Sequence, residues 1–233
     1  DDEAIYYKTS YHKILCKVAA KLEIDFKEPD SNTKLQEKIT QKTFADIISK
    51  LPEDKKKELE EKLLTGEVDL AIHSLKDVPG ILPVGLEIAA VLEREDPRDC
   101  LVSYKYKSLN ELPNGAIIGT SSVRRKVILQ KIRPDLKVIP CRGNIQTRLD
   151  KLSGGNAPDA IILACVGLKR LGIFDEKYCF PLTVDTMIPS AGQGTIAIEK
   201  RSDDQKMADI CKKINHLPSW YLSQAEREFL VYF

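Results

Sequence analysis

Residues 68–79 read VDLAIHSLKDVP, a short apolar run that turns abruptly polar. The apolar part is typical of a buried strand, and Pro79 ends it because proline lacks the N–H that a sheet ladder needs and disrupts a helix. Asp77 is therefore expected at the carboxyl end of a buried strand, where open α/β sheets bind their ligands. We interpret Asp77 as a candidate catalytic acid; a carboxylate that only caps a turn is an equally good interpretation of the spacing.

A pattern of apolar run, polar elbow and helix repeats three times towards the C-terminus. The elbows are residues 119–125, 141–144 and 167–172. This alternation predicts a parallel sheet with crossover helices, and hence the α/β class. The charged segment EREDPRD at 93–99 contains a proline and is interpreted as a crossover between two lobes. Nearer the N-terminus, the apolar periodicity predicts a helix at 11–22 and a strand at 23–27.

The composition limits the class of protein. A chain of 233 residues, 42% of them hydrophobic, can bury the core of one large domain or two smaller ones. The formal net charge of +1 argues against a nucleic-acid-binding protein, and no apolar run is long enough to span a membrane. The acidic start lacks the apolar segment of a secretory signal, so we expect an intracellular protein. Six cysteines without a CxxC pair and three widely separated histidines predict reduced thiols and no metal site.

Arginines gather at the elbows. Six of the ten arginines lie between residues 120 and 170, namely Arg124, Arg125, Arg133, Arg142, Arg148 and Arg170, and all but Arg133 stand at or just past an elbow. Ser122 is a typical helix N-cap, whereas Arg124 and Arg125 in the first turn face the positive end of the helix dipole. An anion bound there by N–H groups, hydroxyls and guanidinium groups would relieve this repulsion. The alternative is that both side chains extend into solvent.

The other elbows show weaker forms of the same pattern. Gly143 lets the backbone turn, and Arg148 follows one turn into the next helix, where a solvent-facing side chain is an equally good interpretation. The glycines at 192–194 would let backbone approach a ligand, although two glycines are weak evidence. Because arginine favours planar, bidentate partners, we expect a ligand with several carboxylates or phosphates, bound between the two lobes.

Six motifs, in their order along the chain, resemble the porphobilinogen deaminase family, also called hydroxymethylbilane synthase. They are HSLKDVP (73–79), GTSSVRR (119–125), RGNIQTRLDKL (142–152), DAIILACVGLKRLG (159–172), AGQGTIAIE (191–199) and AEREFL (225–230). The resemblance implies a transferase of porphyrin and haem biosynthesis, which condenses four porphobilinogen molecules, with loss of ammonia, into the linear tetrapyrrole hydroxymethylbilane. It also implies a dipyrromethane cofactor, covalently bound in the family.

The resemblance further implies roles for individual residues. Asp77 would stabilise the positive charge that forms on a pyrrole when ammonia leaves. The other implied catalytic residues are Lys76, Arg125, Arg142 and Arg148. The implied cofactor-binding residues are Ser74, Thr120, Ser121, Ser122, Arg124, Arg125, Arg142, Gly143 and Gln193, and the implied substrate-binding residues are Arg148 and Arg170. No metal ligand is expected.

The implied fold consists of two α/β lobes of the periplasmic-binding-protein type with mixed sheets, followed by the start of a third α+β domain that is largely absent. We expect lobe 1 at 1–98 with 189–216, lobe 2 at 99–188, and a remnant of the third, cofactor-attachment domain at 217–233. The family's N-terminal elbow, IGTRxSxLA, and its Gly-Gly-Cys attachment segment have no match in this sequence. The expected state is a cytoplasmic monomer, with a plastid as the alternative location and without a nucleic-acid or membrane partner.

Two other classes of function stay open at this point. A non-catalytic, bilobed binding protein for a small di- or polycarboxylate would need the arginines but not Asp77. A phosphosugar-binding enzyme would use the serine-rich elbow as a phosphate cradle. A covalent dipyrrole adduct in the mass of the full-length protein would support the synthase and neither of the others.

Overall fold

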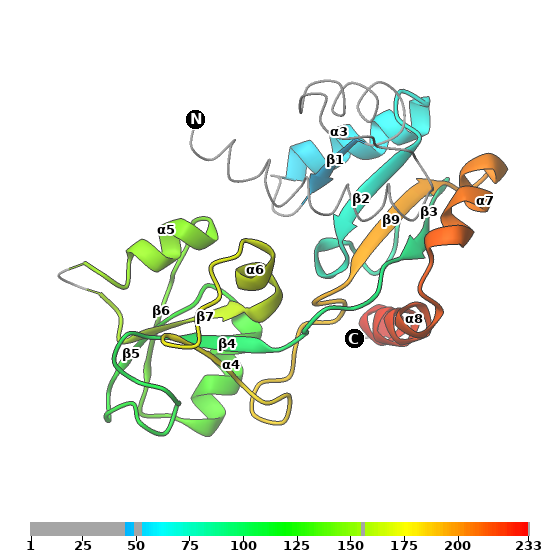
Figure 1. Cartoon of the computed structure of the whole chain (residues 1–233). Helices are drawn as coiled ribbons and strands as arrows, with labels where there is room; N and C mark the ends of the chain where they lie inside the picture. Colours follow the sequence, from blue (N-terminus) through cyan, green and yellow to red (C-terminus); the bar gives the residue numbers. More distant parts are fainter. Residues whose placement is uncertain (1–44, 49–52, 155–156, 233) are drawn as a thin grey trace. The chain divides into compact units, whose positions relative to one another are not determined.

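The computed structural model describes residues 45–48, 53–154 and 157–232, which form two compact units (Figure 1). Unit 1 comprises Asp1–Glu95 and Ala191–Phe233, and unit 2 comprises Asp96–Ser190. The chain therefore divides at 95/96 and 190/191, whereas the sequence prediction set the divisions at 98/99 and 188/189. The helix predicted at 11–22 and the strand predicted at 23–27 lie outside the described residues.

The sheet of unit 1 has four strands in the order β1-β2-β9-β3. They are β1 (Ala45–Ile48), β2 (Leu70–Ser74), β3 (Leu86–Val91) and β9 (Ile196–Arg201). β1 and β2 are parallel, whereas β9 runs antiparallel to both of its neighbours. Because β9 follows unit 2 in the sequence, this sheet is completed only when the chain has returned from unit 2.

Helices cover both faces of the unit 1 sheet. They are α3 (Glu53–Thr65), α7 (Gln205–Ile214) and α8 (Leu217–Tyr232), and Figure 1 shows α7 and α8 beside β3. On one face, alternate residues of β2 and β9 such as Ile72 pack on Met207 of α7. The apolar clusters of the other face include Leu63 of α3 and Trp220 of α8. Helix α8 thus packs on unit 1, and the start of a third domain at 217–233 stays a prediction.

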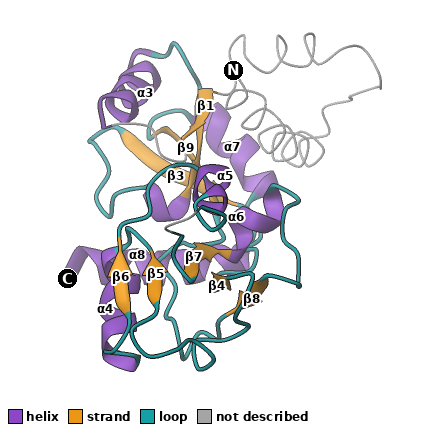
Figure 2. Cartoon of the chain, turned by 90° about the vertical axis from the view of Figure 1, so that its left-hand side faces the viewer, coloured by secondary structure: helices purple, strands orange, loops and turns teal. Residues whose placement is uncertain are grey.

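The sheet of unit 2 has five strands in the order β6-β5-β7-β4-β8. The parallel strands β5 (Ile117–Gly119), β6 (Lys137–Ile139) and β7 (Ala160–Ala164) alternate with the helices α4 (Val123–Ile132), α5 (Ile145–Asp150) and α6 (Cys165–Arg170) (Figure 2). β4 (Asp99–Val102) is antiparallel to β7 and to β8 (Cys179–Pro181). The predicted repeat of strand, elbow and helix is confirmed after β5 and β6. The third predicted elbow, at 167–172, is wrong, because α6 begins directly after β7 and includes residues 167–170. The α/β class with a mixed sheet in each of two units is confirmed.

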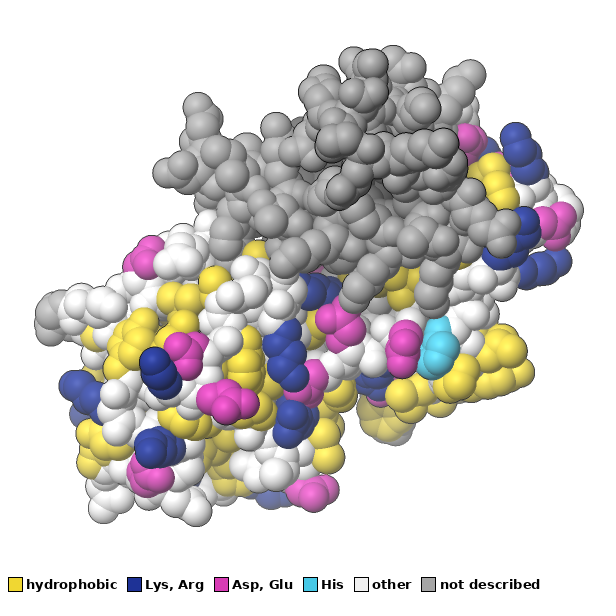
Figure 3. Space-filling model, in the orientation of Figure 1, with side chains coloured by type: hydrophobic (Ala, Val, Ile, Leu, Met, Phe, Trp, Pro, Cys, Tyr) yellow, Lys and Arg dark blue, Asp and Glu magenta, His cyan; other side chains and the backbone are white. Residues whose placement is uncertain are grey.

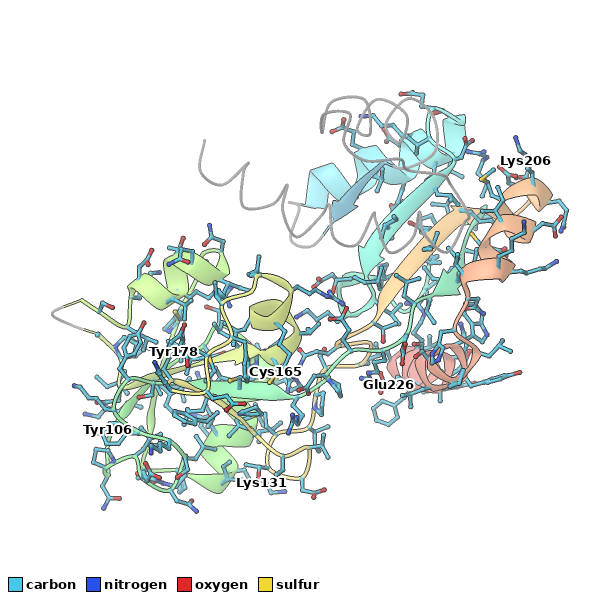
Figure 4. The ribbon with its side chains drawn as sticks, in the orientation of Figure 1. Tyr106, Lys131, Cys165, Tyr178, Lys206 and Glu226 are labelled. Atoms are coloured by element: carbon cyan, nitrogen blue, oxygen red, sulfur yellow. The ribbon has the colours of Figure 1, made fainter. Side chains whose placement is uncertain are left out.

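The carboxylate of Glu226 in α8 accepts hydrogen bonds from both segments of unit 1 that connect to unit 2. Arg94, on the first segment, donates from Nη1 to Glu226 of α8 (2.7 Å) and from Nε to the carbonyl of Gln193 (2.9 Å). On the second segment, the N–H of Gly192 donates to the other oxygen of Glu226 (2.6 Å). Figure 4 shows Glu226 on α8. The two segments are therefore held at their unit 1 ends by the same side chain.

We expect Glu226→Gln to lower the free energy of unfolding by about 1–3 kcal/mol, because a charge-assisted pair with Arg94 becomes a neutral hydrogen bond. Urea denaturation followed by the fluorescence of Trp220, the single tryptophan and a residue of the same helix, measures the change. Glu228→Gln alters an exposed glutamate two residues farther along the helix and should leave the midpoint unchanged. An unchanged midpoint in Glu226→Gln as well would show that this contact contributes no stability.

Candidate functional site

Asp77 ends a single 3-10 turn, η1 (Leu75–Asp77), that directly follows β2. All five residues of β2 are buried, and the N–H of Val78 closes the turn on the carbonyl of Leu75 (3.1 Å). The N–H of Leu75 donates to the carbonyl of Thr195 (3.0 Å), which ties the turn to the segment before β9. The predicted buried strand and its abrupt end are therefore confirmed, and Asp77 stands just beyond the carboxyl end of β2.

Asp77 lines a pocket of about 560 Å³ within unit 1, called here the Asp77 pocket. Its charged lining consists of Lys57 and Glu60 of α3 together with Lys76 and Asp77. Its apolar wall comes from Val78, Pro79, Ile81, Leu82 and Pro83. Lys76 and Asp77 are half-buried. A concave site with charges of both signs against an apolar wall suits a small ring that carries acid groups and N–H donors. Ser74 is buried at the end of β2 and does not line this pocket.

The turn at 192–194 supports η1. Gly192 has a φ of +69°, and a Cβ at this position would lie 2.8 Å from the Cγ of Leu75, so a side chain there would displace η1. Gln193 is 1% exposed, and its carbonyl accepts the bond from Arg94 described above. The contact of Gln193 with a cofactor stays a prediction.

The first two elbows of unit 2 meet at one edge of its sheet. β5, β6 and β7 are parallel, so their carboxyl ends and the elbows that follow lie at the same edge. Ser122 is the N-cap of α4, and Asn144 is the N-cap of α5, where its side chain accepts a bond from the N–H of Thr147 (2.8 Å). The hydroxyl of Ser121 accepts a bond from the N–H of Cys141 (3.1 Å). The structure thus brings the predicted residues of these two elbows together.

Two arginines of the first elbow bind a carboxylate of the chain itself. Arg124 and Arg125 each donate from Nη2 to a different oxygen of Asp99, both at 2.7 Å. Asp99 is fully buried and Arg125 is 6% exposed. Asp99 reaches this edge because β4 is antiparallel, so that its first residue pairs with Ala164, the last residue of β7. Asp99 was not among the predicted site residues, although an acidic residue just before the apolar run at 100–102 was a visible signal.

Arg148 and Arg142 carry donors that no described residue uses. Arg148 is half-buried and donates from Nε to the carbonyl of Gly143 (2.7 Å), whereas its terminal nitrogens have no hydrogen-bond partner among the described residues. Burial lowers the pKa of Arg148, and the nearby cation of Arg125 acts in the same direction. The guanidinium of Arg142 is exposed and likewise lacks a partner within the described part of the chain. A carboxylate would satisfy both groups with charge-assisted bonds.

The other predicted residues of unit 2 have supporting positions. Gly143 has a φ of +116°, and a Cβ there would lie 2.8 Å from the side chain of Thr147, so glycine is required at this turn. Thr120 is buried, and its hydroxyl accepts a bond from the N–H of Ser122 (3.2 Å). Arg170 ends α6 and is half-buried. Their roles in binding stay predictions.

The described ranges lack the features of a metal site, a disulfide and a membrane-spanning helix. These ranges hold no group of three or more histidine, cysteine or acidic side chains arranged to bind a metal ion. All five cysteines in them are buried and outside disulfides. None of the helices in these ranges combines the length and the apolar character needed to cross a membrane. Figure 3 shows basic and acidic side chains interspersed on the visible face of unit 2.

A family model matches most of this chain. The model described as "Porphobilinogen deaminase, dipyromethane cofactor binding domain" matches residues 18–209. This chain belongs to the porphobilinogen deaminase family. The matched residues include Asp77 and all three arginine-bearing elbows, and the family that the six motifs indicated is therefore confirmed.

Relatives named porphobilinogen deaminase include proteins of two Rickettsia species. The protein of Rickettsia rickettsii (strain Sheila Smith) is 57% identical over 176 residues, which are 76% of this chain and 50% of that protein. The protein of Rickettsia prowazekii (strain Madrid E) is 54% identical, over 76% of this chain and 58% of that protein. The chain spans about half the length of the curated relatives it matches. Among solved structures, an ABC-transporter periplasmic substrate-binding protein from Coxiella burnetii matches over 94% of each chain, with 14% identity and a TM-score of 0.47.

Proposed function

We propose that this chain forms the catalytic part of an enzyme that condenses four porphobilinogen molecules, with loss of ammonia, into hydroxymethylbilane. The observation that carries the proposal is the position of Asp77, just beyond the end of a buried strand and in a pocket with Lys57 and Lys76. Membership of the porphobilinogen deaminase family supports the reaction. The pocket supports the chemistry, because a substrate with acid groups that becomes cationic needs charges of both signs.

Asp77 is the group that acts on the reacting pyrrole in this proposal. A carboxylate accepts hydrogen bonds from pyrrole N–H groups and stabilises the cation that forms when ammonia leaves. The ammonium groups of Lys57 and Lys76 line the same pocket and suit the acetate and propionate groups of porphobilinogen. Neither lysine can take the place of Asp77, because an ammonium group would repel the transient cation.

The elbows of unit 2 bind the acid groups of the pyrroles in this proposal. Arg142 and Arg148 supply donors that no described residue uses, and the exposed hydroxyl of Ser121 lies at the same sheet edge. Arg124 and Arg125 are held by Asp99 and add positive charge to this edge. Five donors in a rigid fork make each guanidinium well suited to a carboxylate.

The described residues fit the acid groups of a dipyrromethane cofactor but not its covalent attachment. Ser121, Arg142 and Arg148 would hold the acid groups through the donors named above. All five described cysteines are buried, and none follows a pair of glycines, so none of them fits the attachment thiol. When bound, the cofactor supplies the primer on which the pyrrole chain grows.

The test of the proposed function is the turnover of porphobilinogen by the full-length protein. An enzyme of this kind releases ammonia and accumulates a linear tetrapyrrole, which an ammonia assay and mass spectrometry detect. Binding of porphobilinogen without release of ammonia would contradict the proposal and favour the alternative, a non-catalytic binding protein for a small di- or polycarboxylate. The intact mass gives a second readout, since a covalent dipyrrole adduct is expected only for the synthase.

We further propose that the protein works as a monomer in the cytoplasm. The Rickettsia relatives are bacterial proteins, which favours the cytoplasm over a plastid. Analytical ultracentrifugation of the full-length protein tests the monomeric state, and a sedimentation coefficient that rises with protein concentration would contradict it.

Arg148→Ala is expected to weaken the binding of porphobilinogen by about 10- to 100-fold, because the variant loses charge-assisted bonds to a carboxylate. Equilibrium titration with porphobilinogen measures the dissociation constant. Arg133→Ala serves as the control, since Arg133 at the C-terminal end of α4 is already paired with Asp135 (2.7 Å). Equal affinity in both variants would show that Arg148 binds no acid group of the substrate.

A further inference from the structure

A buried, hydrogen-bonded pair of side chains lies next to the segment that carries Asp77 and has no part in the chemistry proposed above. Nε2 of His73 and Oε2 of Glu199 are 2.7 Å apart. His73 is 9% exposed and Glu199 is 1% exposed. His73 belongs to β2 and Glu199 to β9, and His73 immediately precedes the segment 74–80 in which Asp77 lies. The pair is therefore placed to act on that segment.

Both side chains of the pair point to the sheet face on which this segment packs. In the β2–β9 pairing, His73 lies opposite Ala197, and Glu199 lies opposite Ala71. Opposite residues of an antiparallel pair share a face of the sheet. Ala197 belongs to the apolar cluster that also contains Leu75 of η1 and Val78. The segment 74–80 thus packs against the same sheet face that bears His73 and Glu199.

Arg227 of α8 holds the far end of the segment. Its Nη2 donates to the carbonyl of Gly80 (3.0 Å). Burial lowers the pKa of Arg227, and the carboxylate of Glu199 acts in the opposite direction. The network of His73, Glu199 and Arg227 therefore engages the segment 74–80 at both ends, through His73 where it begins and through Gly80 where it ends.

Stability alone does not explain this network. Oε1 of Glu199 and Nη1 of Arg227 are buried atoms without a hydrogen-bond partner among the described residues. Buried polar atoms that lack a hydrogen bond destabilise the folded state. Unfavourable arrangements of this kind concentrate at functional sites, where they hold a reacting group in place.

We propose that Glu199, together with His73 and Arg227, fixes the conformation of residues 74–80 and thereby the position of the Asp77 carboxylate. None of the three lines the Asp77 pocket, so they are positioning residues. This inference rests on the proposed function, because the carboxylate must be held in place for the reaction assigned to it. It extends that function to three residues that lie in the motifs quoted above but had no role assigned to them, and that lie outside the pocket lining.

The experiment compares Glu199→Gln with Glu87→Gln in the full-length protein. Glu199→Gln keeps the shape of the side chain but removes its charge, and we expect kcat to fall by about 10- to 100-fold with KM changed less than about threefold. Hydrogen exchange at the N–H of Val78 should become faster, since that bond closes η1. Glu87 is a matched control because it pairs with Lys200 (2.8 Å), which adjoins Glu199 on β9 but points to the opposite face. Glu87→Gln should change neither quantity.

A conservative replacement separates positioning from general destabilisation. His73→Gln retains an N–H that can reach Glu199, whereas His73→Leu does not, so His73→Gln is expected to keep more of kcat than His73→Leu. Equal kcat values in the two His73 variants would contradict the proposal. If Glu199→Gln does not fold, Arg227→Gln is judged by the same kcat and exchange criteria.

The result that overturns the proposal is unchanged kcat and unchanged exchange at Val78 in Glu199→Gln. An equal loss of kcat in Glu87→Gln would also overturn it, because the effect would then not belong to this face of the sheet. Failure of the proposed function is a separate result, since it would appear as a parent protein that does not consume porphobilinogen. In that case hydrogen exchange at the N–H of Val78 still tests the positioning proposal. Faster exchange in Glu199→Gln supports it, and unchanged exchange refutes it.

Discussion

Asp77→Asn is expected to lower the kcat for consumption of porphobilinogen by about 100- to 1,000-fold while leaving the unfolding midpoint unchanged. Asparagine has nearly the same shape as aspartate but no negative charge, so it cannot stabilise the cation that forms when ammonia leaves. Asp77 is half-buried at the edge of a pocket and not in the core, so the change should not disturb packing. The loss should therefore appear in the chemical step.

Single-turnover measurements with a fixed amount of porphobilinogen test this prediction. They follow the release of ammonia in the chemical step, and their rate does not depend on how fast the tetrapyrrole dissociates. Glu60→Gln is the comparison, since Glu60 contributes the other carboxylate of the Asp77 pocket. If Asp77 acts through its position on η1, Glu60→Gln should reduce the rate far less than Asp77→Asn. A near-normal rate in Asp77→Asn, or equal losses in the two variants, would refute the assignment of the acid.

The site of Asp77 was predictable because its signals are local. An apolar run followed by polar residues and Pro79 is sufficient to place the end of β2, since proline cannot continue either a ladder or a helix. The N-caps Ser122 and Asn144 likewise act on their own helices. Local chemistry of this kind can be read from neighbouring residues, which is why the first two elbows of unit 2 appear where the sequence indicates them. The third was placed wrongly, because residues 167–170 belong to α6, whose N-cap, Ala164, has no capping side chain.

The antiparallel strands were not predictable in the same way. β9 enters the unit 1 sheet between β2 and β3, and β4 lies between β7 and β8, yet an apolar run carries no information on the direction in which its strand runs. The direction of β4 decides that Asp99 lies at the edge where Arg124 and Arg125 begin α4. The contacts of Glu199 with His73 and of Glu226 with Arg94 also join segments that are far apart in the sequence. These contacts depend on tertiary structure, and so the sequence analysis did not find them.

Asp99 changes the interpretation of Arg124 and Arg125, because the anion that they bind belongs to the chain itself. Two cations in the first turn of a helix call for an anion, and the structure supplies one from within the chain. Asp99 neutralises part of this charge and fixes the direction of both guanidinium groups. Arg142 and Arg148, whose unused donors lie at the second elbow, are therefore better candidates for direct contact with an external carboxylate than Arg125, which is buried.

The second large effect is expected from Asp99→Asn, which should lower the free energy of unfolding by about 3–5 kcal/mol, because removing one partner of a buried ion pair leaves uncompensated charge in the core. Asp99 is fully buried, and both of its oxygens accept bonds of 2.7 Å from arginines, so the variant leaves both arginines without their anionic partner. Urea denaturation monitored by circular dichroism measures the change.

Asp135→Asn is the matched control, since Asp135 forms an aspartate–arginine pair of the same length, with Arg133, at a partly exposed position of the same unit. We expect the control to stay close to the parent protein, because solvent screens an exposed pair. Equal midpoints for Asp99→Asn and Asp135→Asn would show that Asp99 does not compensate the two arginines, and the elbow would then need an external anion to hold them.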